Sequence, residues 1–179
     1  MRGLRLSNSK VKKRIQKSCV VLHIQTSGDN PWCNCILQIG AVRFLDSNEA
    51  DTFLVDLIPY STPQYDEIEE VIPNEYLSSS AQRVKMKDAF DRLEEFVGED
   101  LVILYNADHI LRFFYNSRPD KIFLPLYVEA DLVLKKVYGS NSSQFDLYKN
   151  TGVDFYKPRS ALNIAREIGV AFLTATDYF

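Results

Sequence analysis

The sequence is poor in cysteine and contains no long apolar run. Its three cysteines, Cys19, Cys33 and Cys35, are an odd number without a wider spacing pattern, which argues against a secreted fold held by disulfides. No segment reaches the ~18 apolar residues that a membrane-spanning helix requires, and the basic start of the chain lacks the apolar stretch of a secretory signal. These absences lead us to expect a cytoplasmic protein with no membrane partner.

Internal repeats and low-complexity tracts are absent as well. The chain has 179 residues, of which 46% are hydrophobic, 12% aromatic and 25% charged, as in an ordinary globular domain. A chain of this length buries a substantial core without help from disulfides or metals. We therefore expect one globular domain over residues 18–179.

Charge is distributed unevenly along the chain. Residues 1–17 carry seven basic side chains and no acidic one, whereas the rest carries 14 basic and 24 acidic side chains, a net charge of −10. An acidic body repels phosphate backbones, but a short basic arm can anchor nucleic acid. We expect residues 1–17 to form a flexible basic arm, although a solvated terminus without a ligand remains the simpler interpretation. The candidate nucleic-acid contacts in this arm are Lys10, Lys12, Lys13 and Arg14.

Hydrophobic patterning predicts three strands at the start of the domain. Alternating and β-branched runs occur at residues 19–25, 36–45 and 52–58. Their spacing favours an antiparallel three-stranded meander.

Helices and strands alternate in the second half. Helical periodicity over residues 81–97 ends at Gly98, a buried strand is predicted at 101–105, and a helix at 108–115. The last predicted elements are a strand at 124–128 and helices at 131–138 and 160–168, with Gly169 as the final helix stop. This order predicts an α/β, ribonuclease H-like fold with a mixed five-stranded sheet, three antiparallel strands first and flanking helices.

Three segments carry a more specific pattern. Residues 20–44 lead into a second strand that reads ILQIGAV, residues 101–114 join an apolar strand to Asn106, Ala107 and a helix, and residues 157–170 form a late helix. Together they resemble the DEDD family of DnaQ-like, proofreading and oligoribonuclease-type 3′–5′ exonucleases. The resemblance implies a nucleic-acid substrate and hydrolysis by two divalent ions that four carboxylates hold.

The carboxylates of that family are replaced in this chain. The positions that match its first motif fall on His23 and Gln25, and those of its second motif on Tyr105, Asn106 and Ile110. Imidazole and amide groups are poor substitutes for anionic oxygen around Mg²⁺, and an aliphatic side chain cannot bind a metal. We therefore expect no catalytic residues, no metal site and no cofactor.

Two further carboxylates do not restore the pattern. Asp108 precedes Ile110 by two residues, which rotates its side chain by about 200° around a helix. The family's final motif is expected just beyond Val170, where the chain offers Asp177 but no histidine and too few residues for a closing helix. The resemblance therefore implies a domain whose C-terminal helix is truncated.

Two weaker signals lie near the first motif. Trp32 follows the first predicted strand, near where the family's substrate lies, and is a candidate for stacking with nucleic acid, although packing is the simpler explanation. His23 with Cys33 and Cys35 is a weak zinc pattern, because structural zinc usually has four ligands in a recognisable spacing.

Three functions are compatible with this pattern. The favoured one is a catalytically inactive exonuclease-like domain, a pseudo-exonuclease that binds nucleic acid or a protein partner. The alternatives are a 3′–5′ exonuclease with a non-standard Mg²⁺ or Mn²⁺ site that uses His23, Asp108 and Asp177, and a structural subunit of a larger assembly. The sequence does not specify the oligomeric state.

Overall fold

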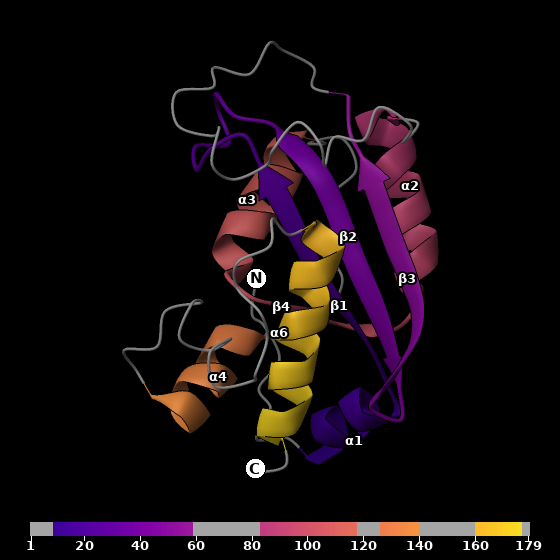
Figure 1. Cartoon of the computed structure of the whole chain (residues 1–179), viewed down its shortest axis with the longest axis vertical. Helices are drawn as coiled ribbons and strands as arrows, with labels where there is room; N and C mark the ends of the chain where they lie inside the picture. The colour runs from indigo at the N-terminus through magenta and orange to yellow at the C-terminus, as the bar shows by residue number, and fades with distance from the viewer. Residues whose placement is uncertain (1–8, 59–82, 118–125, 140–159, 177–179) are drawn as a thin grey trace.

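A five-stranded mixed sheet in the order β3-β2-β1-β4-β5 forms the centre of the protein (Figure 1). The computed structural model describes residues 9–58, 83–117, 126–139 and 160–176. Antiparallel pairing joins β1 to β2 and β2 to β3, whereas β4 pairs in parallel with both β1 and β5. The strands are β1 (Ser18–Thr26), β2 (Ile36–Leu45), β3 (Asn48–Asp56), β4 (Leu101–Leu104) and β5 (Tyr127–Glu129).

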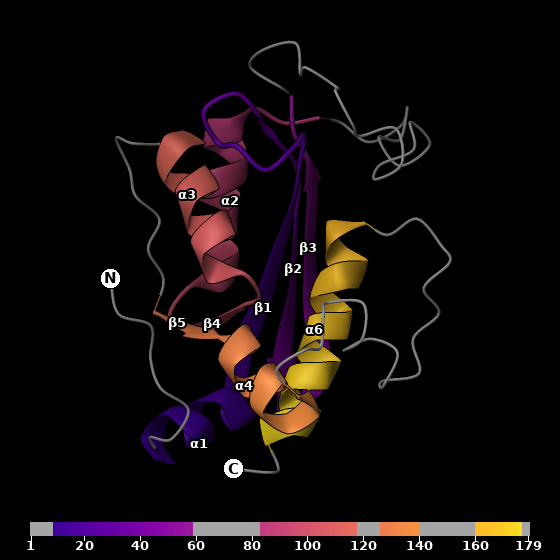
Figure 2. The ribbon, with the colours of Figure 1, turned by 90° about the vertical axis from the view of Figure 1, so that its left-hand side faces the viewer.

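Helices cover both faces of the sheet. Figure 2 shows α2 and α3 on one side and α4 and α6 on the other. Successive side chains of a strand point to opposite faces, so alternate residues of β1 belong to two different cores. Cys19 and Val21 pack with α6, whereas Val20 and Leu22 pack with α2 and α3. The helices are α1 (Ser9–Lys17), α2 (Met86–Val97), α3 (Ala107–Ser117), α4 (Ala130–Tyr138) and α6 (Ala161–Thr176).

The predicted fold class is confirmed, and the differences lie at element ends. Strand β3 begins at Asn48 rather than residue 52, because Asp46 and Ser47 adopt positive φ angles of 48° and 64° and close a two-residue hairpin turn without glycine. Helix α2 begins at Met86 rather than residue 81, since Val84 instead forms a bridge with Leu57. None of the helices in the described ranges is long and apolar enough to cross a membrane.

Two glycines allow α6 to lie directly on the sheet. A Cβ atom on Gly40 would lie 2.2 Å from the backbone N of Leu162, and one on Gly169 would lie 2.4 Å from the ring of Phe44. The predicted helix stop at Gly169 is therefore wrong: glycine serves close packing there, and the helix continues to Thr176. Of residues 171–179, which were expected to be too few for a closing helix, residues 171–176 form the end of α6, and 177–179 lie outside the described residues.

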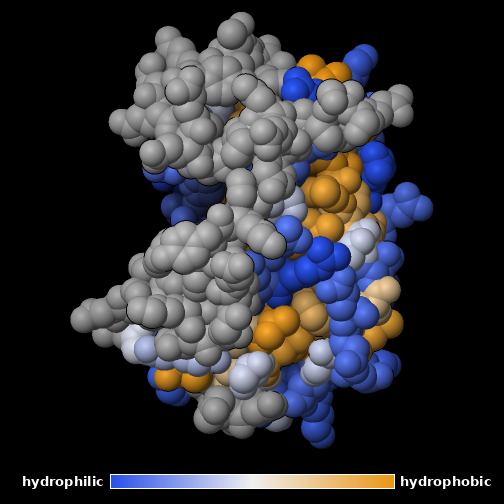
Figure 3. Space-filling view, in the orientation of Figure 1, coloured by the Kyte–Doolittle hydropathy of each residue, from blue (hydrophilic) through white to orange (hydrophobic). Residues whose placement is uncertain are grey.

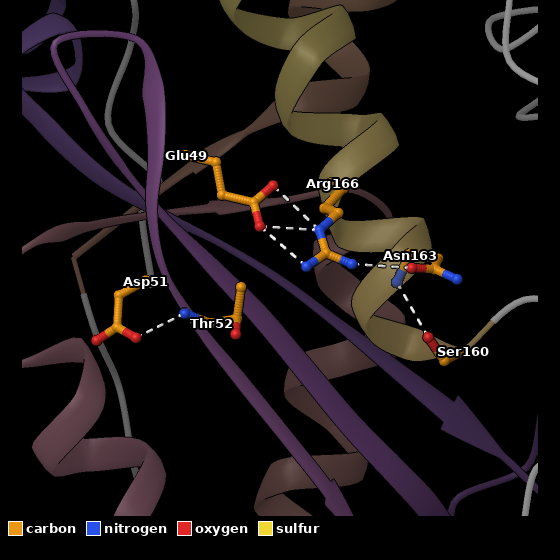
Figure 4. Close-up of polar contacts among 6 residues, drawn as sticks. All are labelled: Glu49, Asp51, Thr52, Ser160, Asn163 and Arg166. Carbon is orange, nitrogen blue, oxygen red and sulfur yellow. Dashed lines mark hydrogen bonds and ion pairs between the residues drawn. The ribbon is translucent and has the colours of Figure 1, made fainter.

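A polar contact fixes α6 against the edge strand β3. Arg166 forms an ion pair of 2.9 Å with Glu49 and donates a further hydrogen bond to the side chain of Asn163 (Figure 4). The Oγ of Ser160 accepts the backbone N–H of Asn163, as expected of a helix N-cap. On this face of the molecule, Figure 3 shows a hydrophilic band with apolar surface on either side of it.

The basic arm is partly structured. Residues 9–17 form α1, in which Val11 and Ile15 are buried in the same core as α6, so the expectation of a flexible arm is wrong for these residues. Two apolar side chains four residues apart share one face of a helix, and their burial holds the basic segment on the domain. Residues 1–8 of the expected arm lie outside the described residues.

Candidate functional site

The matched motif positions meet where β1 and β4 end. Parallel pairing of Leu22 with Leu104 brings the residues that follow them, His23 and Tyr105, to the same edge of the sheet. His109 of α3 lies close enough to His23 to influence its pKa. We call the group of His23, Gln25, Tyr105, Asn106 and His109 the β1/β4 site.

His23 is a neutral imidazole in this site. Burial and, to a lesser extent, the neighbouring His109 lower its pKa to about 4. Its Nδ1 atom is buried and has no hydrogen-bond partner among the described residues. At neutral pH the position therefore supplies an uncharged nitrogen, whereas the family pattern has a carboxylate there.

Gln25 lies beside a second buried amide, Gln38, its partner on β2. The Nε2 of Gln38 donates to Asp56 Oδ1 at 2.7 Å, and its Oε1 accepts the backbone N–H of Ala161 at 2.5 Å. Gln38 thereby anchors the first turn of α6 to the sheet. Sequence reasoning matched Gly40 to the family's second strand without a structural role and missed Gln38, although a glutamine inside an otherwise apolar strand is a signal that a buried polar group has a partner.

The start of α6 lies over the polar end of β1. Gly40 pairs with His23 across the β1–β2 ladder, and the backbone of Leu162 sits directly on Gly40. Residues 161–166, the first turns of the helix, contain no carboxylate. Gly169, by contrast, contacts Phe44 and Val21, which are further from this end of the strand. The start of α6, rather than the residues beyond Val170, therefore lies over this end of β1, and Asp177 lies outside the described residues.

Ile110 and Asp108 point in different directions, as the helical spacing predicts. Ile110 is buried in the core that α2 and α3 share. Asp108 is exposed and lies 3.7 Å from Arg112 one turn further along α3. The side chain of Ile110 has no metal-binding group, and the carboxylate of Asp108 is directed to solvent and Arg112.

Asp131 of α4 supports the turn that leads into α3. Its Oδ2 accepts the backbone N–H of Asn106 at 2.8 Å, and Asn106 has a positive φ of 56°. Left-handed backbone is tolerated best by glycine and asparagine, which explains the asparagine at this point. Burial and the nearby charge of Asp131 raise the pKa of Tyr105, so its hydroxyl stays protonated and can donate a hydrogen bond.

Acidic side chains surround the outer part of the site without converging. The pKa of His109 is lowered overall, chiefly by burial. The charges of Asp29 and Asp108 act to raise this pKa, and the charge of Arg112 acts to lower it. Within the described ranges, no group of three or more His, Cys, Asp or Glu side chains could hold a metal ion.

The loop between β1 and β2 is held by its own hydrogen bonds. Asn34 donates from Nδ2 to the carbonyl of Ser27, accepts the N–H of Asn30 at Oδ1, and donates its backbone N–H to the carbonyl of Asn30. The hydroxyl of Ser27 accepts the N–H of Cys35, which is buried. A side-chain bond from Asn116 of α3 to the carbonyl of Pro31 clamps the loop to that helix.

Trp32 projects from this braced loop into solvent. Its side chain is 77% exposed. Its backbone is held in the loop, because its N–H donates to Asn30 Oδ1 at 3.1 Å. A large aromatic ring on an ordered loop normally packs against the protein, so this exposure is the less expected outcome. Cys33 beside it is also exposed, whereas Cys35 is buried.

The predicted basic residues do not join Trp32. Both ribbon views place α1, which carries Lys10, Lys12, Lys13 and Arg14, at one end of the sheet and the β1–β2 loop at the other (Figures 1 and 2). The structure thus divides the predicted nucleic-acid contacts between two separate regions.

Comparison with solved structures identifies the fold. Exonuclease X, solved with 5′ overhanging duplex DNA, matches 89% of this chain and 92% of its own, with a TM-score of 0.62 and 13% identity. The nuclease domain of 3′hExo, a DEDDh family member bound to rAMP, matches 89% of this chain and 90% of its own, with a TM-score of 0.62 and 12% identity. The cell-death related nuclease CRN-4 has a TM-score of 0.69 at 7% identity, over 90% of this chain and 64% of its own.

The fold is therefore the ribonuclease H-like fold of DEDD-type 3′–5′ exonucleases, as the sequence resemblance implied. No family model and no curated protein matches the sequence itself.

Proposed function

We propose that this chain is a non-hydrolysing exonuclease-like module that binds single-stranded nucleic acid without a metal ion. The observation that carries the proposal is the chemistry of the β1/β4 site. His23 and Gln25 occupy the polar end of β1, and Ile110, one of the positions matched to the second motif, is buried in the core. Phosphodiester hydrolysis by this fold requires two ions clamped by carboxylates, which these groups cannot replace.

Loss of the carboxylates leaves groups that suit binding. Tyr105 offers a hydroxyl donor, and Trp32 offers an exposed ring on a braced loop. Bases stack on such rings with about 1–3 kcal/mol each and with little regard to sequence, because every base has a π-face. The nuclease structures solved with DNA and with rAMP support nucleic acid as the ligand class.

Trp32 provides its own assay, because it is the only tryptophan in the chain. Titration with a single-stranded oligonucleotide in the presence of EDTA is expected to quench its fluorescence in a saturable way. Trp32→Ala is expected to weaken binding, measured by fluorescence anisotropy of a labelled oligonucleotide, by about 5- to 150-fold if one base stacks there. Tyr115→Ala serves as the matched control, since Tyr115 of α3 is also an exposed aromatic residue.

The outcomes separate the proposal from its competitors. Saturable quenching without degradation of the oligonucleotide supports the binding module. Degradation that depends on Mn²⁺ supports an exonuclease with a non-standard site. Absence of both binding and degradation contradicts the proposal and favours a protein-binding or structural subunit.

A further inference from the structure

Four basic side chains form a stripe along one face of α1. Lys10, Lys13, Arg14 and Lys17 are spaced at i, i+3, i+4 and i+7, which places them within about 100° around the helix, and all four are exposed. Val11 and Ile15 occupy the opposite, buried part of the helix surface. We call these four residues the α1 stripe.

The stripe is unfavourable for the helix that carries it. Like charges three and four residues apart repel, and α1 contains no acidic residue to offset them. The first turn, where the helix dipole favours negative charge, carries Lys10 and Lys12 instead. A helix of nine residues is too short to be stable alone, so burial of Val11 and Ile15 maintains the stripe in spite of this repulsion. An anionic ligand would relieve the repulsion.

The surroundings confine the positive charge to a narrow band. Arg14 donates a hydrogen bond to the backbone carbonyl of Glu99, and Lys17 accepts one from the N–H of Asp46, so two exposed acidic residues flank the helix. Asp100 forms an ion pair with Arg43. The rest of the chain is strongly acidic. A negatively charged ligand must therefore be narrow in cross-section to contact the stripe without approaching the carboxylates of Glu99 and Asp46.

We propose that the α1 stripe binds the phosphate backbone of a single-stranded nucleic acid, as a second contact separate from the β1/β4 site and the Trp32 loop. This inference rests on the proposed function and locates the positive charge that the acidic β1/β4 region lacks. The stripe extends about 10 Å along the helix axis, or about three intervals of the 3.4 Å axial spacing of a helical strand, which accommodates about four phosphates.

A flat anionic membrane fits the stripe less well than a strand does. Interfacial helices insert large apolar side chains into the bilayer, but both apolar side chains of α1 are buried. A flat membrane would also face the flanking Glu99 and Asp46. A single strand can follow the stripe and avoid both.

The separation of the two contacts predicts a length dependence. Strand β1 joins α1 to the Trp32 loop and has nine residues, which span about 30 Å. A nucleic-acid strand that reaches both must cover that distance, or about nine nucleotides at the same axial spacing. Oligonucleotides of about 6 nucleotides therefore engage one contact, and those of about 20 nucleotides engage both.

The test is the salt dependence of binding of a labelled single-stranded oligonucleotide of about 20 nucleotides between ~50 and ~200 mM salt. With four phosphate contacts, log Kobs is expected to fall against log salt with a slope near −3, since each contact contributes about −0.7 on single strands. In Lys13→Ala/Lys17→Ala the slope should fall to about half of that value. Lys85→Ala/Lys87→Ala removes two exposed lysines near the start of α2 and is the charge-matched control.

Circular dichroism and thermal unfolding confirm that each variant is folded, and removal of two repelling charges should not lower the stability of α1. A slope that is equal in wild type, the stripe variant and the control overturns the inference. If Trp32→Ala still weakens binding in that case, the proposed function stands and only the stripe is excluded. If the stripe variant loses binding to anionic vesicles but not to the oligonucleotide, the ligand is a membrane and the inference is wrong.

Discussion

The packing of α6 on β2 makes Gly40→Ala a severe substitution. Alanine is normally favoured over glycine inside a strand by roughly 0.5–1 kcal/mol, because it loses less backbone entropy on folding. Here the added Cβ would lie 2.2 Å from the backbone N of Leu162 and 2.3 Å from the carbonyl carbon of Ala161. Backbone atoms cannot rotate away as a side chain can, so α6 must move outward by about 1 Å to restore van der Waals contact.

The cost follows from two terms. Overpacking of a close-packed core costs about 1–3 kcal/mol. The same movement lengthens the hydrogen bond from Ala161 to Gln38, which is 2.5 Å in the structure, and its loss costs about 1 kcal/mol. After the backbone-entropy gain of alanine, we expect the free energy of unfolding to fall by about 1–3.5 kcal/mol.

Urea denaturation followed by circular dichroism measures this change as a lower midpoint with an unchanged m value. A wild-type or higher midpoint would refute the reasoning, because it would mean that α6 does not lie on Gly40 and that its first turns do not cover His23.

Four further predictions concern the packing of α6, the buried His23, the core position Ile110 and the β1–β2 loop. Gly169→Ala should lower the melting temperature even though alanine is favoured in helices by about 1 kcal/mol, and a higher melting temperature would contradict close packing of α6. His23 has a pKa of about 4 in the folded protein against 6.5 unfolded, so the unfolded state binds the proton first and stability should fall as pH decreases from about 6.5 to 4, by about 2–3 kcal/mol. His23→Gln should flatten that part of the stability–pH curve, and a curve identical to wild type would show that His23 is not buried as described. Ile110→Asp places a carboxylate in the core and should destabilise the fold by more than ~3 kcal/mol without creating Mg²⁺ binding, which calorimetry checks. Tight Mg²⁺ binding by this variant would contradict the burial of position 110 away from a metal site. Asn34→Ala should speed hydrogen exchange of residues 27–35, and unchanged exchange would mean that Asn34 does not brace the loop.

Strands with one clear pattern could be predicted from the sequence. The run at residues 36–45 is apolar and β-branched, and β2 has the predicted bounds. The exonuclease-like order of elements followed from such runs, and the comparison with solved structures confirms the fold. The two-residue turn at Asp46 and Ser47 was not predicted, because Ser47 stands where the usual Asp-Gly turn signal has glycine, although Asp46 suits a positive φ.

Glycine and charge gave the misleading signals. Gly169 has the sequence signature of a helix stop, but whether a glycine ends a helix or admits a close neighbour depends on Phe44, which is distant in sequence. The basic composition of residues 9–17 concealed the pair Val11 and Ile15, too few apolar residues for a confident helix without knowledge of the core they join. The role of Gln38 likewise depends on a helix that begins at Ala161.

The replaced carboxylates were visible in the sequence, but their surroundings were not. His23, Gln25 and Ile110 are read directly from the matched motifs. The start of α6 over Gly40, with no carboxylate in its first turns, emerges only from the three-dimensional arrangement.

The central claim is that this fold binds nucleic acid here without cutting it. The most direct measurement is incubation of the protein, in molar excess, with a 5′-labelled single-stranded DNA or RNA in Mg²⁺ or Mn²⁺, with bound and shortened strands resolved on native and denaturing gels. We predict a retarded but full-length strand in both metals. A ladder of shortened products that disappears in Asp108→Ala would contradict the account, because it would place a working metal site where the structure shows an exposed carboxylate paired with Arg112.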